Sequence, residues 1–515
     1  MTLEVQHHPF VHHRSRRFHV ILLLMIGYFS MALMTSNIGI TLNCMINSTA
    51  VALDAHKVGA VNEQSFEHGP QENNSSASCA RVEGEEVQDY GGSYAWSVEM
   101  QGYIVGAAFL GGLISTFPSG LAIDRFSIRH LLLASMTLLS IVSVLVPLFA
   151  EQFGPFGVIV LRFFMGVGEG MMIPGINGMI TGWIPLHEKS TAAALLTSGN
   201  QLAGILGNPI AAEFCASTLR WPAVFITSGL LGFLWCIVWQ LTVNNSPENS
   251  KWISDHEIMY LQHHLPDKQF KNEKKTIPWQ SMACSAPLLV VLYSGIIGNM
   301  MIVMILVYIP VYFKDVLMLK VKKNGFYTAL PHACNLVSKI LWGFLMDNLK
   351  RRKTLTATQS VKLSQVLSML TMSVCFLLLA YGVDCTSHGL ALLLMCTIGA
   401  AFGLSISGFL TSLLSLAPNF IGIITSVSQI IGFCGRIATP QIITHFKTVG
   451  TVEEWRGILL VYSVMTVLSA VLFLIWASGE VQPWNSYKGK ELKLVDLRSE
   501  SKTLVDRELR DQTER

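Results

Sequence analysis

Long apolar stretches recur through this chain of 515 residues and limit what it can fold into. A helix that crosses a bilayer needs roughly 20 predominantly apolar residues, and lipid admits almost no other backbone structure. Twelve stretches meet this requirement, with centres near Tyr28, Phe109, Val142, Val167, Ala203, Leu231, Met301, Pro331, Met372, Ala400, Ile431 and Thr466. The fifth and the eighth are the weakest, because polar residues interrupt them. The pattern predicts an all-α membrane protein with twelve transmembrane helices.

The composition fits a chain that is dissolved in lipid. Only 13% of the residues are charged and 51% are hydrophobic, whereas a soluble domain carries roughly 25% charged residues. No basic face alternates with aromatic residues, so we expect no binding of nucleic acid. The first apolar stretch is too long for a signal peptide and lacks a small-residue cleavage site, so we expect it to remain as the first membrane helix.

Polar segments divide the chain into two halves. We expect a cytosolic tail over 1–17, an N-terminal six-helix half over 18–241 with an extracytosolic loop over 46–94, a cytosolic central loop over 242–286, a C-terminal six-helix half over 287–480 and a disordered cytosolic tail over 481–515.

Two signals set the orientation. Basic residues gather in the short cytosolic loops of membrane proteins, and here they precede the first helix and follow the second and the eighth. The sequons at Asn47, Asn73 and Asn74 all lie in the first long loop, which the basic residues place on the opposite side, where glycans are added. We therefore expect a glycoprotein with a cytosolic N-terminus.

The same short motif ends the second and the eighth helix. Gly120 is followed by Asp124 and Arg125, and Gly343 is followed by Asp347 and a basic run. The glycine allows neighbouring helices to approach, and the aspartate can cap a helix and pair with a cation. Its recurrence at equivalent points predicts two parallel six-helix pseudo-repeats, which is the major facilitator fold. We expect these residues to act in gating on the cytosolic side.

Ionisable residues inside membrane helices are costly, so each suggests a function. Arg162 and Glu169 lie two turns apart on the fourth helix, and the stripe Arg162, Gly166, Glu169 and Ile173 can face a central cavity. Arginine suits carboxylate or phosphate recognition, and a partly buried carboxylate can carry a proton or gate the cavity. We expect Arg162 to bind substrate and Glu169 to act in coupling. The alternative is that the two pair with each other or with other helices.

Other polar residues of the spans are weaker candidates. Arg436, flanked by glycines in the eleventh helix, is expected to add positive charge to the substrate site, unless it pairs with a glutamate or extends to the membrane surface. Lys339 is expected to extend to the surface, and His332 to pack between helices. Further substrate-binding candidates, each of which could equally join helices, are Tyr103, Asn200, Gln201 and Asn299.

The ten cysteines have no metal-site spacing. Cys44 and Cys79 flank the extracytosolic loop, and both a disulfide between them and two free thiols are open. No phosphate-binding Gly-x-x-x-x-Gly-Lys-Ser/Thr motif is present, so we expect neither an ATP-driven pump nor an enzyme.

Several motifs, in order along nearly the whole chain, resemble one branch of the major facilitators. Among them are Trp96-x-x-Glu99-x-Gln101-Gly102, Arg162-Phe-Phe-Met-Gly166-Val-Gly168-Glu169-Gly170, Ala329-Leu-Pro331, Glu454-Trp455-Arg456 and Ser478-Gly479-Glu480-Val-Gln482-Pro-Trp484. The chain is identified as a member of the anion:cation symporters, the branch of sialin, the vesicular glutamate transporters and the sodium-phosphate cotransporters.

The resemblance implies secondary active transport of small organic or inorganic anions by alternating access, coupled to sodium, protons or the membrane potential. It also implies roles in transport for Arg162 and Glu169. The chain departs from the branch at several recognition positions, namely Thr35, Asn177, Ser412 and Ser415. An inactive substrate sensor or interaction protein therefore remains the alternative. We expect no cofactor besides a co-transported ion, a monomer, and the plasma membrane, since no acidic dileucine signal lies near either terminus.

Overall fold

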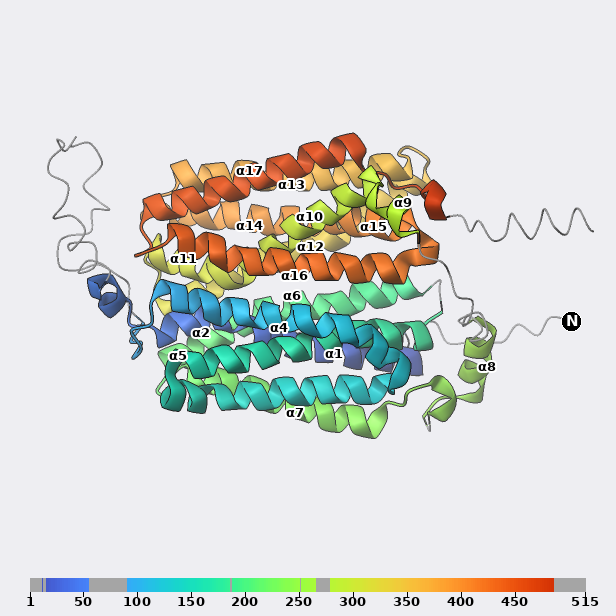
Figure 1. The fold of residues 1–515 in the computed structure, drawn as a ribbon, viewed down its shortest axis with the longest axis horizontal. Helices are drawn as coiled ribbons and strands as arrows, with labels where there is room; N and C mark the ends of the chain where they lie inside the picture. The colour runs from blue at the N-terminus through green and yellow to red at the C-terminus, as the bar shows by residue number, and fades with distance from the viewer. Residues whose placement is uncertain are drawn as a thin grey trace, which may run out of the picture.

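The computed structural model describes residues 12, 15–54, 90–185, 188–250, 252–264 and 278–485, without the side chains at 120–125, 189, 190 and 264. The described elements are helices, and their long axes run side by side in two layers (Figure 1). The first half of the chain forms the lower layer in this view and the second half the upper one.

The first half contains a break at Gly154 that its sequence explains and a slight interruption at Asn37. Gly154 has φ 60° and ψ −145°, a conformation in which glycine meets no steric cost, and it divides one long helix into the third and the fourth span. Asn37 separates the two parts of the first span. The helices are α1 (Arg16–Ser36), α2 (Ile38–Met45), α4 (Val98–Arg125), α5 (Ile128–Trp183), α6 (Lys189–Ala216) and α7 (Pro222–Thr242).

The second half contains two π-helical turns, Met304–Tyr308 and Ile406–Leu410. Pro310 follows the first of them and has no backbone N–H to donate, so the seventh span is irregular at its middle. The helices of this half are α10 (Ala286–Val303), α11 (Ile309–Asp315), α12 (Val321–Arg351), α13 (Ala357–Gly382), α14 (His388–Ser405), α15 (Thr411–Leu416), α16 (Ile421–Phe446) and α17 (Val452–Trp476).

The described helices account for the predicted spans. Within the described residues, nine stretches are long and apolar enough to cross a membrane, with α5 counted once among them. The helices α6 and α12, of 28 and 31 residues, run alongside these stretches but are more polar, as the sequence analysis expected of the fifth and the eighth span. With α5 divided at Gly154, the prediction of twelve membrane helices in two halves is confirmed.

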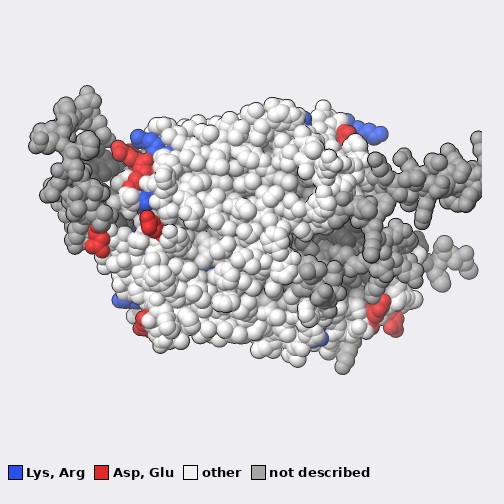
Figure 2. Space-filling view, in the orientation of Figure 1, with Lys and Arg blue, Asp and Glu red and all other residues white. Residues whose placement is uncertain are grey.

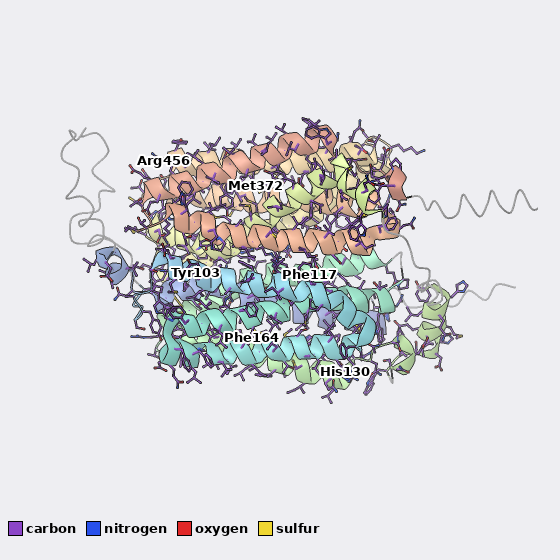
Figure 3. The ribbon with its side chains drawn as sticks, in the orientation of Figure 1. Tyr103, Phe117, His130, Phe164, Met372 and Arg456 are labelled. Carbon is purple, nitrogen blue, oxygen red and sulfur yellow. A yellow bond between two sulfur atoms is a disulfide. The ribbon has the colours of Figure 1, made fainter. Side chains whose placement is uncertain are left out.

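The surface shows where lipid lies. Figure 2 shows charged residues gathered at the two ends, with a belt between them that is almost free of charge on the face in view. Phe117 and Phe164, labelled midway along the bundle in Figure 3, are 64% and 45% exposed. An apolar belt of this kind contacts the hydrocarbon of a bilayer. We call the end that holds Arg16 and Trp476 the terminus end, and the end that holds Cys44 and Tyr94 the loop end.

A short helix of the central segment, α8 (Asp255–His264), is tied to the terminus end of the first half. Arg17 is fully buried there, with Nη1 2.6 Å from Glu188 Oε2 and Nε 3.0 Å from Glu257 Oε1. Burial and the nearby Glu188 raise the pKa of Tyr260, so its phenol stays protonated and donates to Glu188 Oε1 at 3.3 Å. The carboxylates of Glu188 and of Glu257 in α8 thus hold Arg17 inside the protein.

At the loop end, Cys44 and Cys215 form a disulfide with their Cα atoms 6.1 Å apart. It joins α2 to α6 across 171 positions of sequence. Both alternatives that the sequence left open for Cys44 are therefore wrong, because the helix bundle brings together two helix ends that are distant in the chain. Cys79 lies outside the described residues.

Candidate substrate site between the two halves

A cavity of about 70 Å³ lies at the middle of the bundle between the two layers of helices. Its walls come from α1, α4, α5 and α6 of the first half and from α10, the π-helical turn at 304–308 and α16 of the second. The polar residues that line it are Tyr28, Thr35, Ser36, Arg162, Glu169, Asn200 and Arg436. The cavity has room for several water molecules in this conformation.

Arg162 enters this cavity from α5 as a buried cation, with 1% of the residue exposed. Nη1 and Nη2 lie 3.3 and 3.4 Å from the Thr35 carbonyl oxygen, and Nη1 lies 3.1 Å from Met165 Sδ. Nε has no hydrogen-bond partner. No carboxylate of the described residues lies within ion-pair distance of Arg162. Its guanidinium is therefore held by neutral acceptors and can bind an anion.

Glu169 and Arg436 form an ion pair across the boundary between the halves. Arg436 Nη1 donates to Glu169 Oε1 at 2.8 Å, and its Nε donates to Asn299 Oδ1 at 2.9 Å. The guanidinium also lies over the Phe433 ring, 5.1 Å from the centroid. Of the readings proposed for Arg436, pairing with a glutamate is the one that the structure shows.

The predicted stripe on the fourth span holds for its ionised residues only. Arg162 and Glu169 both line the cavity. Gly166 instead packs against α4, where an added Cβ would lie 1.7 Å from the Ala108 carbonyl oxygen. Its lack of a side chain is needed for the contact between α4 and α5. Ile173 is not part of the cavity wall.

The remaining substrate-binding candidates divide into two groups. Asn200 lines the cavity, and Asn299 holds Arg436. Gln201 faces the second half instead, and its Nε2 donates to Asn335 Oδ1 at 3.2 Å. Tyr103 lies away from the cavity with a residue exposure of 52%, near the loop end of α4 (Figure 3). Polarity alone could not tell which face of its helix each of these residues occupies.

The gate motif is only partly visible. Asp347 pairs with Lys350 of its own helix at 2.8 Å, and both side chains are at the surface. No atom of the described residues lies within 4 Å of a Cβ added at Gly343, so they show no close helix approach there in this conformation. Gly120, Asp124 and Arg125 lie in the last turns of α4, and the structure describes only their backbone.

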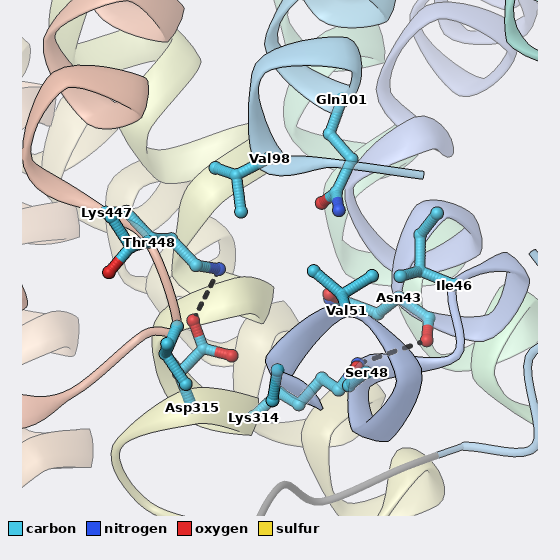
Figure 4. Close-up of a pocket in the computed structure, with 12 residues that line it drawn as sticks. Asn43, Ile46, Ser48, Val51, Val98, Gln101, Lys314, Asp315, Lys447 and Thr448 are labelled. Carbon is cyan, nitrogen blue, oxygen red and sulfur yellow. Dashed lines mark hydrogen bonds and ion pairs between the residues drawn. The ribbon is translucent and has the colours of Figure 1, made fainter. Parts of the chain in front are cut away.

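The loop end holds an ionic cluster that the sequence analysis missed (Figure 4). Lys447 Nζ lies 2.6 Å from Asp315 Oδ2, which also accepts from Trp455 Nε1 at 3.2 Å. Lys314 is 3% exposed, and its Nζ donates to Ser48 Oγ at 2.5 Å and to the Asn43 carbonyl oxygen at 3.3 Å. In the sequence, Lys314 and Asp315 at a helix end are indistinguishable from a solvated turn.

Polar contacts between the two halves lie at the loop end and at mid-height. At the loop end, Lys314 binds the first half, and Asn324 Nδ2 donates to Tyr90 Oη at 3.0 Å. At mid-height, Arg436 binds Glu169, and α12 binds α6. Among the described side chains, no polar contact joins the halves at the terminus end itself. The protein is thus closed at its loop end.

Two six-helix halves around a charged central cavity define the class of integral membrane transporters with parallel repeats. The sequence model of the Major Facilitator Superfamily matches residues 24–440, and the chain belongs to this family. It is a transporter-family protein and not an enzyme, and the resemblance to the anion:cation symporter branch is confirmed by its relatives.

The relatives cover nearly the whole chain. An "uncharacterized transporter slc-17.3" of Caenorhabditis elegans is 37% identical, over 92% of this chain and 90% of its own length. Sialin of Ovis aries is 27% identical, over 91% of each chain. A "putative inorganic phosphate cotransporter" of Drosophila melanogaster is 25% identical, over 93% of this chain and 88% of its own.

The fold is also found among solved structures. The inward-open xylose transporter XylE of E. coli superposes with a TM-score of 0.62 at 15% identity, over 89% of this chain and 96% of that one. At this identity the likeness concerns the fold alone.

Proposed function

We propose that this protein is a secondary active transporter of small organic or inorganic anions that bear a carboxylate or a phosphate. The observation that carries the proposal is Arg162, a buried cation in the cavity between the halves that has no carboxylate at ion-pair distance among the described residues. A charge at mid-bilayer costs at least ~2.5–3.5 kcal/mol, and a bound anion would offset that cost. The phosphate named in one relative has the same chemistry.

The ion pair between Glu169 and Arg436 suggests how transport is coupled. An anion that enters the cavity meets Arg162 first, because Arg436 is neutralised by Glu169. A proton or a sodium ion taken up by Glu169 releases Arg436, which can then join Arg162 in holding the anion. The pair joins the two halves, so its release also frees them to rock about the cavity. A sodium gradient, a proton gradient and the membrane potential are the candidate driving forces.

The terminus end is proposed to face the cytosol. The basic residues that flank the spans support this side. The disulfide at the loop end supports an oxidising compartment on the other side. Asn47 is half-buried and its Oδ1 accepts from the Ala50 backbone N–H at 2.8 Å, while Asn73 and Asn74 lie outside the described residues. If this loop is glycosylated, treatment with a peptide N-glycosidase will increase the electrophoretic mobility of the protein.

The membrane is proposed to be the plasma membrane, and the protein a monomer. The absence of an acidic dileucine signal near either terminus supports the cell surface. Surface biotinylation of an epitope-tagged chain would label most of the protein if this holds, whereas a fully protected pool would place it in an internal membrane.

The test is uptake by the purified protein in liposomes. Labelled phosphate, L-glutamate, N-acetylneuraminate and urate are offered while sodium, proton and voltage gradients are imposed separately. We expect one gradient to drive one class of anion, and Arg162→Ala to reduce uptake at least 100-fold. The matched control is Lys362→Gln, which removes a cation that donates to the Ile475 carbonyl oxygen, 3.4 Å away and outside the cavity. Uptake that survives in Arg162→Ala would contradict the proposal.

A further inference from the structure

Another buried cation, Lys339, lies between the halves, where α12 packs against α6. Lys339 Nζ donates to Thr197 Oγ1 at 3.1 Å and to Gln201 Oε1 at 3.5 Å. Only 9% of the residue is exposed. The expectation that Lys339 extends to the membrane surface is therefore wrong, because its side chain turns toward polar groups of the first half.

The charge of Lys339 meets only neutral acceptors in the described structure. No carboxylate of the described residues lies within ion-pair distance of its ammonium group. Lys447, a buried lysine at the end of α16, does have such a partner in Asp315. A hydroxyl and an amide do not neutralise the charge of a buried ammonium group, so an anion that binds there would be strongly stabilised.

The groups around Lys339 are suited to an oxyanion. The Thr197 hydroxyl donates to the Ala193 carbonyl oxygen at 2.9 Å and is free to rotate toward a ligand. The Gln201 amide donates to Asn335 Oδ1 at 3.2 Å and presents a second N–H. An ammonium, a hydroxyl and an amide together supply the charge-assisted and neutral donors with which proteins bind carboxylates and phosphates.

The position of this cluster relates it to the central cavity. Asn200, on the same helix and next to Gln201, lines that cavity. Thr197 lies three positions closer to the terminus end, which is about 4.5 Å along the helix axis. Since the loop end is closed, a substrate that leaves the cavity in this conformation moves toward the terminus end and passes this level.

We propose that Lys339, Thr197 and Gln201 form a second anion site, which takes the carboxylate or phosphate group of the substrate as it passes between the central cavity and the terminus end. The inference rests on the proposed function. Because the cluster is built from both halves, its donors converge only while α6 and α12 stay together, as they do in this conformation with the loop end closed. The site is therefore expected to lower the KM for substrate at the terminus-end face more than at the loop-end face.

The test uses membrane vesicles of the two opposite orientations, told apart by protease access to a C-terminal epitope. The probes are labelled phosphate and L-glutamate, and the variants are Lys339→Gln, Lys339→Arg and the control Lys362→Gln. We expect Lys339→Gln to raise the KM at the terminus-end face at least 10-fold and the KM at the loop-end face less than 3-fold. Lys339→Arg restores the KM to within 3-fold, and the Tm of both variants stays near that of the parent.

Two results would overturn the site. One is an unchanged KM at both faces in Lys339→Gln. The other is an equal rise of the KM in Lys339→Gln and Lys339→Arg together with a lower Tm in both. That result would mean that Lys339 stabilises the fold through the shape of its hydrogen-bonded side chain and that its charge does not bind the substrate.

The proposed function fails separately, if the parent protein transports neither probe. In that case phosphate binding to the purified protein is measured by calorimetry. The site then requires that Lys339→Gln weaken phosphate binding at least 10-fold, and equal binding by parent and variant rejects it.

Discussion

Glu169 and Arg436 share a 2.8 Å contact across the boundary of the halves, while Arg162 is held by a backbone carbonyl oxygen and a sulfur atom. The two arginines of the cavity thus differ in their readiness to bind an anion. Arg162 needs no exchange of partners, whereas Arg436 must first lose Glu169. In the proposed mechanism, this difference sets the order of events, with binding at Arg162 first and coupling at Glu169 second.

A charge exchange tests the ion pair. Removal of one partner of a buried pair leaves an uncompensated charge and costs about 3–5 kcal/mol. Glu169→Gln and Arg436→Gln are therefore each expected to lower the Tm of the purified protein. The double variant Glu169→Arg with Arg436→Glu should recover most of that loss, because the pair is re-formed in reverse. Single variants with the same Tm as the parent would show that the ion pair does not contribute to the stability of the protein.

At the scale of elements, irregular helix geometry positions the site. The break at Gly154 starts the fourth span, which carries Arg162 and Glu169, and the π-helical turn at 304–308 supplies part of the cavity wall opposite them. At the loop end, the Cys44–Cys215 disulfide joins α2 to α6 within the first half, and the Asp315–Lys447 pair joins α11 to the end of α16 within the second. The hydrogen bonds of Lys314 and Asn324 to the first half hold the loop end closed in this conformation.

The disulfide is expected to stabilise the fold. It closes a loop of 171 positions between Cys44 and Cys215, and removal of a native disulfide costs about 2–5 kcal/mol in small domains. We predict that Cys44→Ser with Cys215→Ser lowers the Tm, while the control Cys284→Ser, at an exposed free cysteine, leaves it unchanged. If a reducing agent lowers the Tm of the double variant as much as that of the parent, reduction of the Cys44–Cys215 disulfide does not explain the lower Tm.

Lys314 at the loop end is expected to set the balance between conformations. Lys314→Met removes the ammonium group that donates to Ser48 Oγ and to the Asn43 carbonyl oxygen of the first half. The closed loop end then loses a contact between the halves, so Val98→Cys, in the wall of the pocket at this end, should react faster with a thiol reagent added from the loop-end side. The matched control is Val98→Cys alone, and equal rates in both proteins would mean that Lys314 does not hold this end shut.

At the scale of the whole molecule, the fold was predictable because lipid leaves a chain few choices. Long apolar stretches, a repeated motif and the polar interruptions around Gln201 and Lys339 sufficed to predict twelve spans in two halves. The pairing of side chains was not predictable. Glu169 and Arg436 are 267 positions apart, and Tyr103 is as polar as the residues that do line the cavity. Hydropathy gives the span but not the face of each helix, and packing between the halves decides that face.

The proposed transport requires the two halves to rock about the cavity. Distances between spin labels in the reconstituted protein measure this motion, with Cys284 and Cys434, the two exposed free cysteines of the described residues, replaced by serine. One label pair joins the halves at the loop end, at Leu219 and Thr386, and one at the terminus end, at Phe126 and Arg352, all of which are exposed.

We expect the transported anion and its driving ion to lengthen the loop-end distance in part of the population and to shorten the terminus-end distance in that same part. A ligand that binds and stabilises the protein while both distances stay fixed would contradict the account. The chain would then be a sensor with the fold of a transporter.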